Sequence, residues 1–495
     1  MHPRTMRITR LAFIAPVVVA LAACSEQPTV PHAAPGAPAL SLSTSSGIPT
    51  GKTVVVFQDT ASIPTAGLEL IGALGGLVSA RWDDVGVAFV TGLSVDALAT
   101  LRASELVAAV GNDRILNWLP RQYDGGVVDA GVDATAHRDP AKARFMADGS
   151  QWGMRMIKAD KAWAAGFQGT PSTRVAILDT GIDYDHRELR GLVDLAASTS
   201  FSHLIVSEAG FEASVPVEPQ YPGDQPYMDN HFHGTHVAAT VASNSISVAG
   251  VAPHVTLVAV KVLNFLGSGS FEGVASGIRH ASTKANAHVI NMSLGANVDR
   301  NEEGAPALLE LMSRVIKSAE KNGTIVISAA GNDAINLDVG SIVSTPCEQS
   351  TICVSATGPL LQQNFDQAAT YTNFGITAIE VAAPGGNFVD GDESAYQTED
   401  LVIGACSRRS SSGTLNVCRS NTDGVVYFYA WAAGTSMASP HAAGAAALVK
   451  SSFPTLSVAG LRSRLLHSAD DVQASGRDVY TNWGRINVAA ALGLE

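Results

Sequence analysis

The stretch 434–444, GTSMASPHAAG, constrains the fold more than any other part of this 495-residue chain. Ser436 lies between small residues, directly before an alanine-rich run at 437–449 that predicts a buried helix. We expect Pro440 in its first turn, where a missing N–H removes no helical bond. The head of such a helix offers unpaired N–H groups and a positive dipole end to an oxygen that becomes anionic. The pattern therefore favours a nucleophilic serine, although most serines before helices are only N-caps.

Two upstream segments carry further reactive side chains. Residues 174–178, RVAIL, predict a strand buried in a parallel sheet, and Asp179 follows at its carboxyl end, where open α/β sheets place functional groups. A lone aspartate there can also be a simple turn former. Residues 233–238, HGTHVA, predict the head of a helix whose two histidines could share a metal. A helical zinc protease would need HExxH, and its glutamate is absent, so we assign no metal.

Taken together, VAILDTGID, HGTHVA and GTSMASPHAAG resemble the three motifs of the subtilisin-like serine peptidases, and they stand in that family's order. The resemblance implies that His233 takes the proton of Ser436 while Asp179 orients His233. It leaves His236 as a packed neighbour. It also implies an α/β fold of three layers with a mostly parallel central sheet, over residues 151–495. Peptide bonds would then be hydrolysed through an acyl-enzyme intermediate, with no cofactor required for catalysis.

Further segments match the family's substrate cleft. Residues 324–328 predict a buried strand, and AAGN follows it, which by resemblance makes Asn332 an oxyanion donor beside the Ser436 N–H. Strands are also predicted at 255–262 and 289–293. By resemblance, the two edges that hold an extended protein or peptide substrate are formed by Gly267, Ser268, Gly269, Ser293, Leu294 and Gly295. Main-chain hydrogen bonds to such edges favour broad specificity.

A structural calcium is present in many relatives, in the loop after the histidine helix. Here residues 244–250 form a short loop, and Glu188 stands where an aspartate ligand is often found. Because of these two departures, the structural calcium of the relatives is not assigned to residues of this chain.

The N-terminus predicts export. Three arginines precede an apolar run at 11–23 that is too short to span a bilayer comfortably, so residues 1–23 are expected to be a signal peptide. Residues 21–24, LAAC, resemble the lipobox of bacterial lipoproteins, which implies lipidation of Cys24. Residues 24–50 are rich in Pro, Ala and Ser and predict a flexible tether. We expect a lipoprotein of the bacterial cell envelope, held to a membrane through Cys24, or else a secreted protein with a free Cys24 thiol.

Residues 51–120 predict a small α/β domain. Strands are expected at 52–57, 88–92 and 106–110, with helices at 66–74 and 94–104 between them. In this position the domain resembles the family's inhibitory propeptide, which implies a zymogen that processes itself and is inhibited by its own propeptide. The polar residues 121–150 are expected to be the linker that is cut.

Composition and cysteines limit the remaining choices. A net charge of −13 argues against nucleic-acid binding, and we expect a monomer. Besides Cys24, four cysteines allow three pairings or free thiols. An exported protein favours the local pairs Cys347–Cys353 and Cys406–Cys418.

Two other functions compete with that of a peptidase. A catalytically silent relative that binds peptides would have no use for an intact Asp179, His233, Ser436 and Asn332 together. An esterase or lipase would place its serine in GxSxG, and GTSMA does not fit that pattern. A serine endopeptidase is therefore the prediction.

Overall fold

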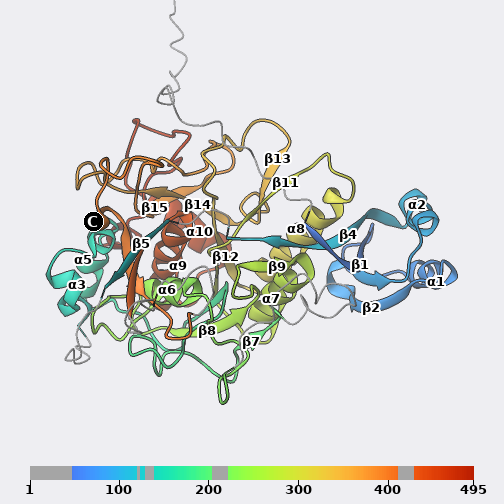
Figure 1. Ribbon diagram of the computed structural model, residues 1–495, viewed down its shortest axis with the longest axis horizontal. Helices are drawn as coiled ribbons and strands as arrows, with labels where there is room; N and C mark the ends of the chain where they lie inside the picture. The colour runs from blue at the N-terminus through green and yellow to red at the C-terminus, as the bar shows by residue number, and fades with distance from the viewer. Residues whose placement is uncertain (1–46, 120–122, 129–138, 203–220, 411–417, 419–427) are drawn as a thin grey trace, which may run out of the picture. The chain divides into compact units, whose positions relative to one another are not determined.

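The structure is a computed structural model that describes residues 47–119, 123–128, 139–202, 221–410, 418 and 428–495 (Figure 1). The expected signal peptide, Cys24 and most of the expected tether lie outside these residues. We describe the compact unit Ser43–Glu495 by itself. In the described part of the chain, no helix is both long enough and apolar enough to cross a membrane.

The central sheet has seven strands in the order β15-β14-β12-β10-β6-β8-β7, and every neighbouring pair is parallel. Its strands are β6 Arg174–Asp179, β7 Thr199–Ser200, β8 Thr256–Lys261, β10 Val289–Met292, β12 Ile325–Ala329, β14 Ile352–Thr357 and β15 Val381–Pro384. Apart from β7, these strands are almost completely buried, because helices cover both faces. The four strands predicted from apolar runs are confirmed as β6, β8, β10 and β12.

Helices form the two outer layers, and alternate residues of each strand enter opposite cores. Val175 and Ile177 pack with α6 His233–Val241 and α9 Thr435–Ser452, whereas Ala176 and Leu178 pack with α7 Phe271–Thr283 and α8 Ala305–Lys321. This confirms the predicted three-layer α/β fold. Further helices are α3 Arg144–Ala147, α4 Trp152–Met156, α5 Ala159–Ala164, α10 Val458–His467 and α11 Val488–Leu492, with short 3₁₀ turns at Asp83–Val85, Pro140–Lys142 and Thr398–Asp400.

The expected position of Pro440 in the first turn of its helix is wrong. Helix α9 begins at Thr435, so Pro440 lies in the second turn. Its missing N–H would have bonded the Ser436 carbonyl. That carbonyl instead accepts a hydrogen bond of 2.7 Å from the Ser293 hydroxyl. The Ser293 side chain, which directly follows β10, thus replaces the lost helical bond.

The N-terminal region contains the sheet β2-β3-β1-β4-β9, all of whose pairs are antiparallel. Its elements are β1 Ile48–Phe57, α1 Thr65–Ala73, β2 Leu77–Trp82, β3 Val87–Thr91, α2 Val95–Ala103, β4 Val107–Asn117 and β9 Ser268–Ser270. The predicted strands and helices are present, but β2 was missed, although Val78, Ala80 and Trp82 alternate with polar residues as in a half-buried strand. Strand β4 is also longer than predicted and reaches β9, about 150 residues further along the chain.

The stretch expected to be a linker also contributes structure. Strand β5, Tyr123–Val128, pairs antiparallel with β17 Tyr429–Ala433, which itself pairs with β16 Val402–Ala405. A separate two-stranded sheet joins β11 Ala296–Asp299 to β13 Ile342–Thr345. In Figure 1, β5 lies close to the labels of α9 and α6. The chain therefore pairs with the main fold both before and after residues 120–122.

Candidate active site

A buried carboxylate and imidazole meet at the carboxyl end of β6. Asp179 ends the strand, and His233 is the first residue of α6. The Asp179 Oδ1 lies 2.7 Å from His233 Nδ1, and both side chains are fully buried. This bond orients the ring and directs Nε2 to the opposite side of the imidazole.

The far side of the imidazole has no partner. Among the described residues, neither His233 Nε2 nor Asp179 Oδ2 has a hydrogen-bond partner, although both atoms are buried. Buried polar atoms are nearly always paired, so such an exception points to a functional role. An imidazole held in this way can accept a proton at Nε2.

Ser436 is the second residue of α9, whose first turn leaves backbone N–H groups without helical partners. Its hydroxyl donates to the Ser293 carbonyl at 3.0 Å and not to His233. Helices α6 and α9 pack against each other, and rotation about one side-chain bond redirects the hydroxyl. The structure thus brings Asp179 and His233 together, and it leaves the serine hydroxyl on a neighbouring carbonyl.

Asn332 is fixed at the head of α9 by its side-chain oxygen. Its Oδ1 accepts hydrogen bonds from the Thr435 backbone N–H at 2.9 Å and from the Thr435 hydroxyl at 2.7 Å. Its Nδ2 therefore lies on the other side of the amide, near Gly434, where an added Cβ would come within 3.2 Å of it. An amide N–H and the first turn of α9 meet here, which suits a developing oxyanion.

A buried aspartate that was not predicted supports this arrangement. The Asp229 carboxylate accepts hydrogen bonds from the hydroxyls of Thr180 at 2.9 Å and Thr235 at 2.6 Å. Burial raises the pKa of Asp229, and the positive charge of Lys261 opposes that rise. Because Thr180 follows Asp179 and Thr235 lies in α6, Asp229 joins the two elements that carry the carboxylate and the imidazole.

His236 packs as the sequence implied. Its Nε2 lies 3.2 Å from the carbonyl oxygens of Val402 and Ala430, and burial lowers its pKa to about 3. The ring is therefore packed against two backbone carbonyls. The described residues include no group of three or more His, Cys, Asp or Glu side chains that could hold a metal.

Glu188, which stands where relatives often have a calcium ligand, accepts hydrogen bonds from the protein itself. Its Oε1 accepts hydrogen bonds from the Ser247 N–H at 2.6 Å, the Val248 N–H at 3.2 Å and the Tyr429 hydroxyl at 2.8 Å. Its Oε2 accepts from the Ile246 N–H at 3.1 Å. Burial raises the pKa of Glu188, and these bonds oppose the rise. The carboxylate therefore fixes the short loop directly.

Both predicted substrate edges hold a segment of this same chain. Leu116 pairs with Gly269 in the antiparallel register of β4 and β9. The Trp118 N–H donates to the Gly267 carbonyl at 2.9 Å, and the Gly295 N–H donates to the Trp118 carbonyl at 3.0 Å. The Trp118 ring is fully buried, and its Nε1 donates to the Gly269 carbonyl at 2.8 Å. The two edges thus bind an extended backbone, as a substrate would require.

The four remaining cysteines form two disulfides, Cys347–Cys353 and Cys406–Cys418. The second lies beside residues that reach the site: Ser407 donates to the Asp229 carbonyl at 2.6 Å, and Arg408 binds the buried Asp183 carboxylate at 2.7 and 2.8 Å. The Arg408 guanidinium lowers the pKa of Asp183 against the effect of burial. This segment anchors the loop that follows Asp179.

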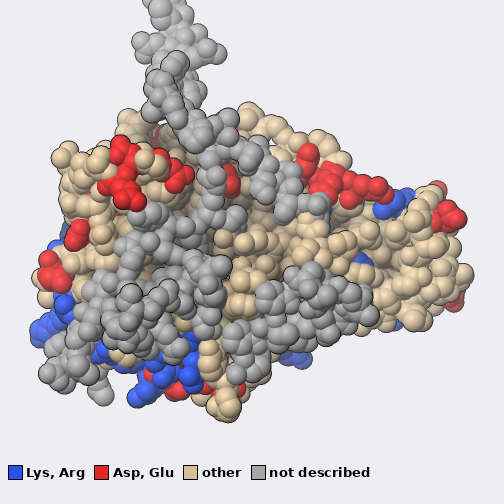
Figure 2. All heavy atoms as spheres, in the orientation of Figure 1, with Lys and Arg blue, Asp and Glu red and all other residues tan. Residues whose placement is uncertain are grey.

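Charges are unevenly distributed on the face drawn in Figure 2. Acidic side chains gather along its upper part, and lysine and arginine side chains gather at the lower left. The negative net charge is therefore not a uniform field over this face.

Comparisons with known proteins agree with this geometry. The family model described as "Subtilase family" matches residues 171–484. The chain is 35% identical over 342 residues to subtilisin DY of Bacillus licheniformis, an alignment that covers 69% of this chain and 97% of the relative. It is 33% identical over 342 residues to subtilisin E of Bacillus subtilis strain 168, covering 69% and 70% of the two chains.

Solved structures share the fold. The epidermin leader peptide processing serine protease of Staphylococcus aureus superposes with a TM-score of 0.66 at 20% identity, covering 90% of this chain and 98% of that one. Fervidolysin of Fervidobacterium pennivorans, a keratinolytic enzyme related to subtilisin, gives 0.63 at 22% identity and covers 90% and 61%. At these identities the likeness concerns the fold alone.

Proposed function

This chain belongs to the subtilase family of serine peptidases, and from that premise we propose that Asp179, His233 and Ser436 form its catalytic triad. The observation that carries the proposal is the buried 2.7 Å pair of Asp179 and His233, whose Nε2 has no partner among the described residues. The packing of α6 against α9 supports it, because His233 is the first residue of α6 and Ser436 is the second residue of α9.

The reaction follows from these positions. His233 Nε2 takes the proton of Ser436, whose Oγ bonds to the carbonyl carbon of the scissile peptide. The C–N bond breaks, and His233 gives the proton to the leaving amine. Water then hydrolyses the ester and restores the serine. Asn332 Nδ2 and the Ser436 N–H stabilise the oxyanion in both steps, and no step needs a cofactor.

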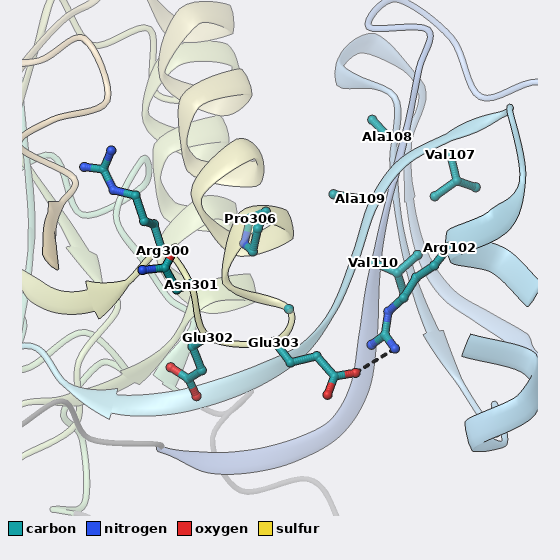
Figure 3. A pocket seen from close by; sticks show the side chains of 11 residues that line it. Arg102, Val107, Ala108, Ala109, Val110, Arg300, Asn301, Glu302, Glu303 and Pro306 are labelled. Atoms are coloured by element: carbon teal, nitrogen blue, oxygen red, sulfur yellow. Dashed lines mark ion pairs between the residues drawn. The ribbon is translucent and has the colours of Figure 1, made fainter. Parts of the chain in front are cut away.

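The region 51–120 acts in this proposal as an inhibitory propeptide. Lys52 binds Glu272 of α7 at 2.7 Å, and Arg102 binds Glu303, before α8, at 2.7 Å (Figure 3). These pairs supplement the strand pairing between β4 and β9. The segment that leaves β4 then blocks the cleft that substrates use.

Two described residues, Leu119 and Tyr123, lie near the nucleophile. Leu119 lines the pocket beside Ser436, and Tyr123 pairs with Ala433, three residues before Ser436. We therefore expect the first cut between Leu119 and Tyr123, near the start of the linker named from the sequence. The protein is made as a zymogen and processes itself.

Two matched variants test the triad. Ser436→Ala should remain full length and should neither hydrolyse casein nor react with a fluorophosphonate label. Ser452→Ala changes a serine on the same helix whose hydroxyl bonds only the Leu448 carbonyl among the described residues, and it should behave as wild type. Full processing by Ser436→Ala would contradict the assignment. An unlabelled, unprocessed wild type would favour a catalytically silent peptide-binding protein.

Export completes the proposal. The apolar run 11–23 and the LAAC sequence support a signal peptide and a lipid on Cys24, which would hold the zymogen at a bacterial membrane. Cys24→Ser should release the protein from the membrane fraction into the soluble fraction. Equal partition of the two proteins would favour secretion without a lipid.

A further inference from the structure

We infer that the pocket beside Ser436 binds a cationic side chain, and that Asp333 makes this peptidase cut after arginine or lysine. The inference rests on the proposed triad and adds the substrate class. The pocket adjoins Ser436 and Asn332 and has Leu294 and Gly295 on its walls. Among the described residues that line it, Asp333 is the one with a charged side chain; the others are small, apolar or neutral polar.

Asp333 is held in place, and its carboxylate can accept a further hydrogen bond. It directly follows Asn332 and is half-buried. Its Oδ2 accepts a hydrogen bond of 2.8 Å from Asn297 Nδ2, and its backbone N–H donates to Asn373 Oδ1 at 3.0 Å. No second hydrogen bond to the carboxylate comes from the described residues. A carboxylate accepts several, so one oxygen is available to a guanidinium or ammonium group.

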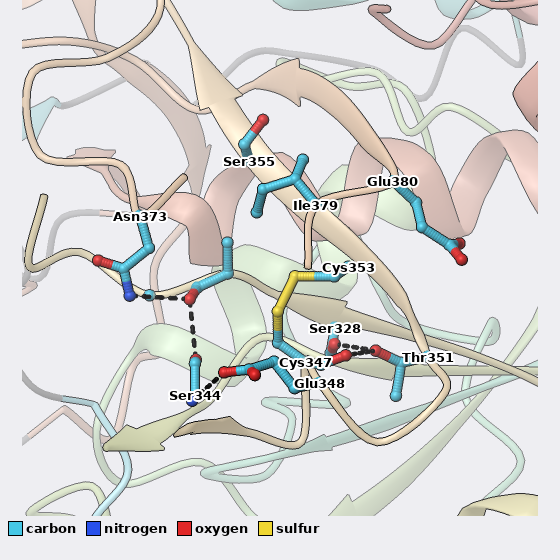
Figure 4. Close-up of a disulfide and its surroundings, with 12 residues drawn as sticks. Ser328, Ser344, Cys347, Glu348, Thr351, Cys353, Ser355, Asn373, Ile379 and Glu380 are labelled. Atoms are coloured by element: carbon cyan, nitrogen blue, oxygen red, sulfur yellow. Dashed lines mark hydrogen bonds between the residues drawn. A yellow bond between two sulfur atoms is a disulfide. The ribbon is translucent and has the colours of Figure 1, made fainter. Parts of the chain in front are cut away.

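A second carboxylate is hydrogen-bonded to one wall of the pocket. Ser344 lines the pocket, and its N–H donates to Glu348 Oε1 at 2.7 Å (Figure 4). Burial raises the pKa of Glu348, while the Ser344 N–H and the charge of Arg300 lower it. Trp118 and Leu119 of this chain also line the pocket, and Gly295, Ala329 and Gly331 present little side chain to it. The methylene groups of a substrate stem that takes the place of the chain's own segment can cover Leu294 while the charged head reaches Asp333.

The chain's own sequence fits such a pocket. Only Pro120, Arg121 and Gln122 lie between Leu119, which lines the pocket, and Tyr123, which pairs with Ala433. Arg121 is the one cationic residue of the three. The first self-processing cut is therefore inferred at the Arg121–Gln122 peptide bond.

The test compares two peptides that differ only in the residue before the cut, lysine or norleucine, which have stems of equal length. A charged hydrogen bond is worth about 10- to 100-fold, so wild type should favour the lysine peptide in kcat/KM by at least about tenfold. Asp333→Asn should remove most of this ratio. Glu393→Gln deletes an exposed carboxylate that does not line the pocket, and it should leave the ratio unchanged.

The ratio of the two kcat/KM values distinguishes a change in specificity from a general loss of activity, because a general loss lowers both values together. Wild type that prefers norleucine, or an Asp333→Asn ratio equal to that of wild type, would overturn the inference while leaving the triad intact. Cleavage of neither peptide nor of casein would instead count against the proposed function. In the zymogen, Arg121→Lys should process like wild type and Arg121→Met at least about tenfold more slowly. Equal processing of Arg121→Met would remove Arg121 from the inference.

Discussion

Glutamine in place of Glu188 should destabilise the fold without touching the reacting groups. The Glu188 carboxylate accepts four hydrogen bonds, three from successive backbone N–H groups and one from Tyr429. The side chain is fully buried, so water cannot replace a lost partner. Glutamine has nearly the same shape, and the comparison therefore isolates the charge and the second acceptor oxygen.

The expected cost can be worked from these bonds. If the glutamine oxygen replaces Oε1, its NH₂ group faces the Ile246 N–H and leaves that donor unpaired, which costs about 2 kcal/mol. The other three bonds lose their charged acceptor, at about 1 kcal/mol each. Relief from burying an ion offsets about 2 kcal/mol. The net loss in the free energy of unfolding is then about 3 kcal/mol.

The assay is guanidinium unfolding at pH 7.5 in a Ser436→Ala background, which prevents self-digestion. Glu188→Gln should unfold at a clearly lower midpoint, and the exposed control Glu393→Gln should match its parent. Because the carboxylate binds the loop directly, EDTA and added calcium should not move either midpoint. The reasoning is refuted if Glu188→Gln is as stable as Glu393→Gln, or if EDTA destabilises only the protein that keeps Glu188.

Three further outcomes follow. Asn332→Ala should lower kcat about 10²- to 10³-fold with little change in KM, as loss of one oxyanion donor does in the related subtilisin; an unchanged kcat would exclude this role. Burial and the nearby Glu272 raise the pKa of Asp113 to about 7, and Thr50 and Lys52 oppose the rise. The bound propeptide favours the protonated Asp113 carboxyl. The dissociation constant of the cleaved propeptide should therefore rise between about pH 4 and pH 7, by up to about tenfold per pH unit. Asp113→Asn should remove this pH dependence. Burial also holds four histidine pKa values near 3 or 4, at His186, His231, His236 and His441. The unfolded chain binds protons below about pH 6.5 where the folded chain does not, so urea midpoints should fall between pH 6.5 and 4; a flat profile would contradict this.

The parts of the fold that were predictable are those whose signal is local. Buried parallel strands such as β6 and β12 are continuous apolar runs, and the residues that follow them, Asp179 and Asn332, are marked by short motifs. The order of these motifs was enough to identify the family. Helix α9 was predicted from its alanine content, although its first residue was not.

The parts that were missed depend on partners far away in the chain. Strand β5 has no apolar pattern and is ordered by backbone pairing with β17, about 300 residues later. Asp229 resembles any loop aspartate until folding places it between Thr180 and Thr235. Pro440 was misplaced because the Ser293 hydroxyl, which replaces its missing bond, cannot be read from the helix sequence.

Two hydrogen bonds between Ser293 and Ser436 hold the serine hydroxyl away from His233 when no substrate is bound. Ser436 Oγ donates to the Ser293 carbonyl, so in this conformation the hydroxyl is not presented to His233. That carbonyl lies on the predicted substrate edge, where the backbone N–H of an extended peptide would compete for it. Docking of a substrate backbone would then free the hydroxyl to turn toward the imidazole. Binding of a peptide would thus activate Ser436. Small electrophiles that lack a backbone N–H would react with Ser436 more slowly than peptides do.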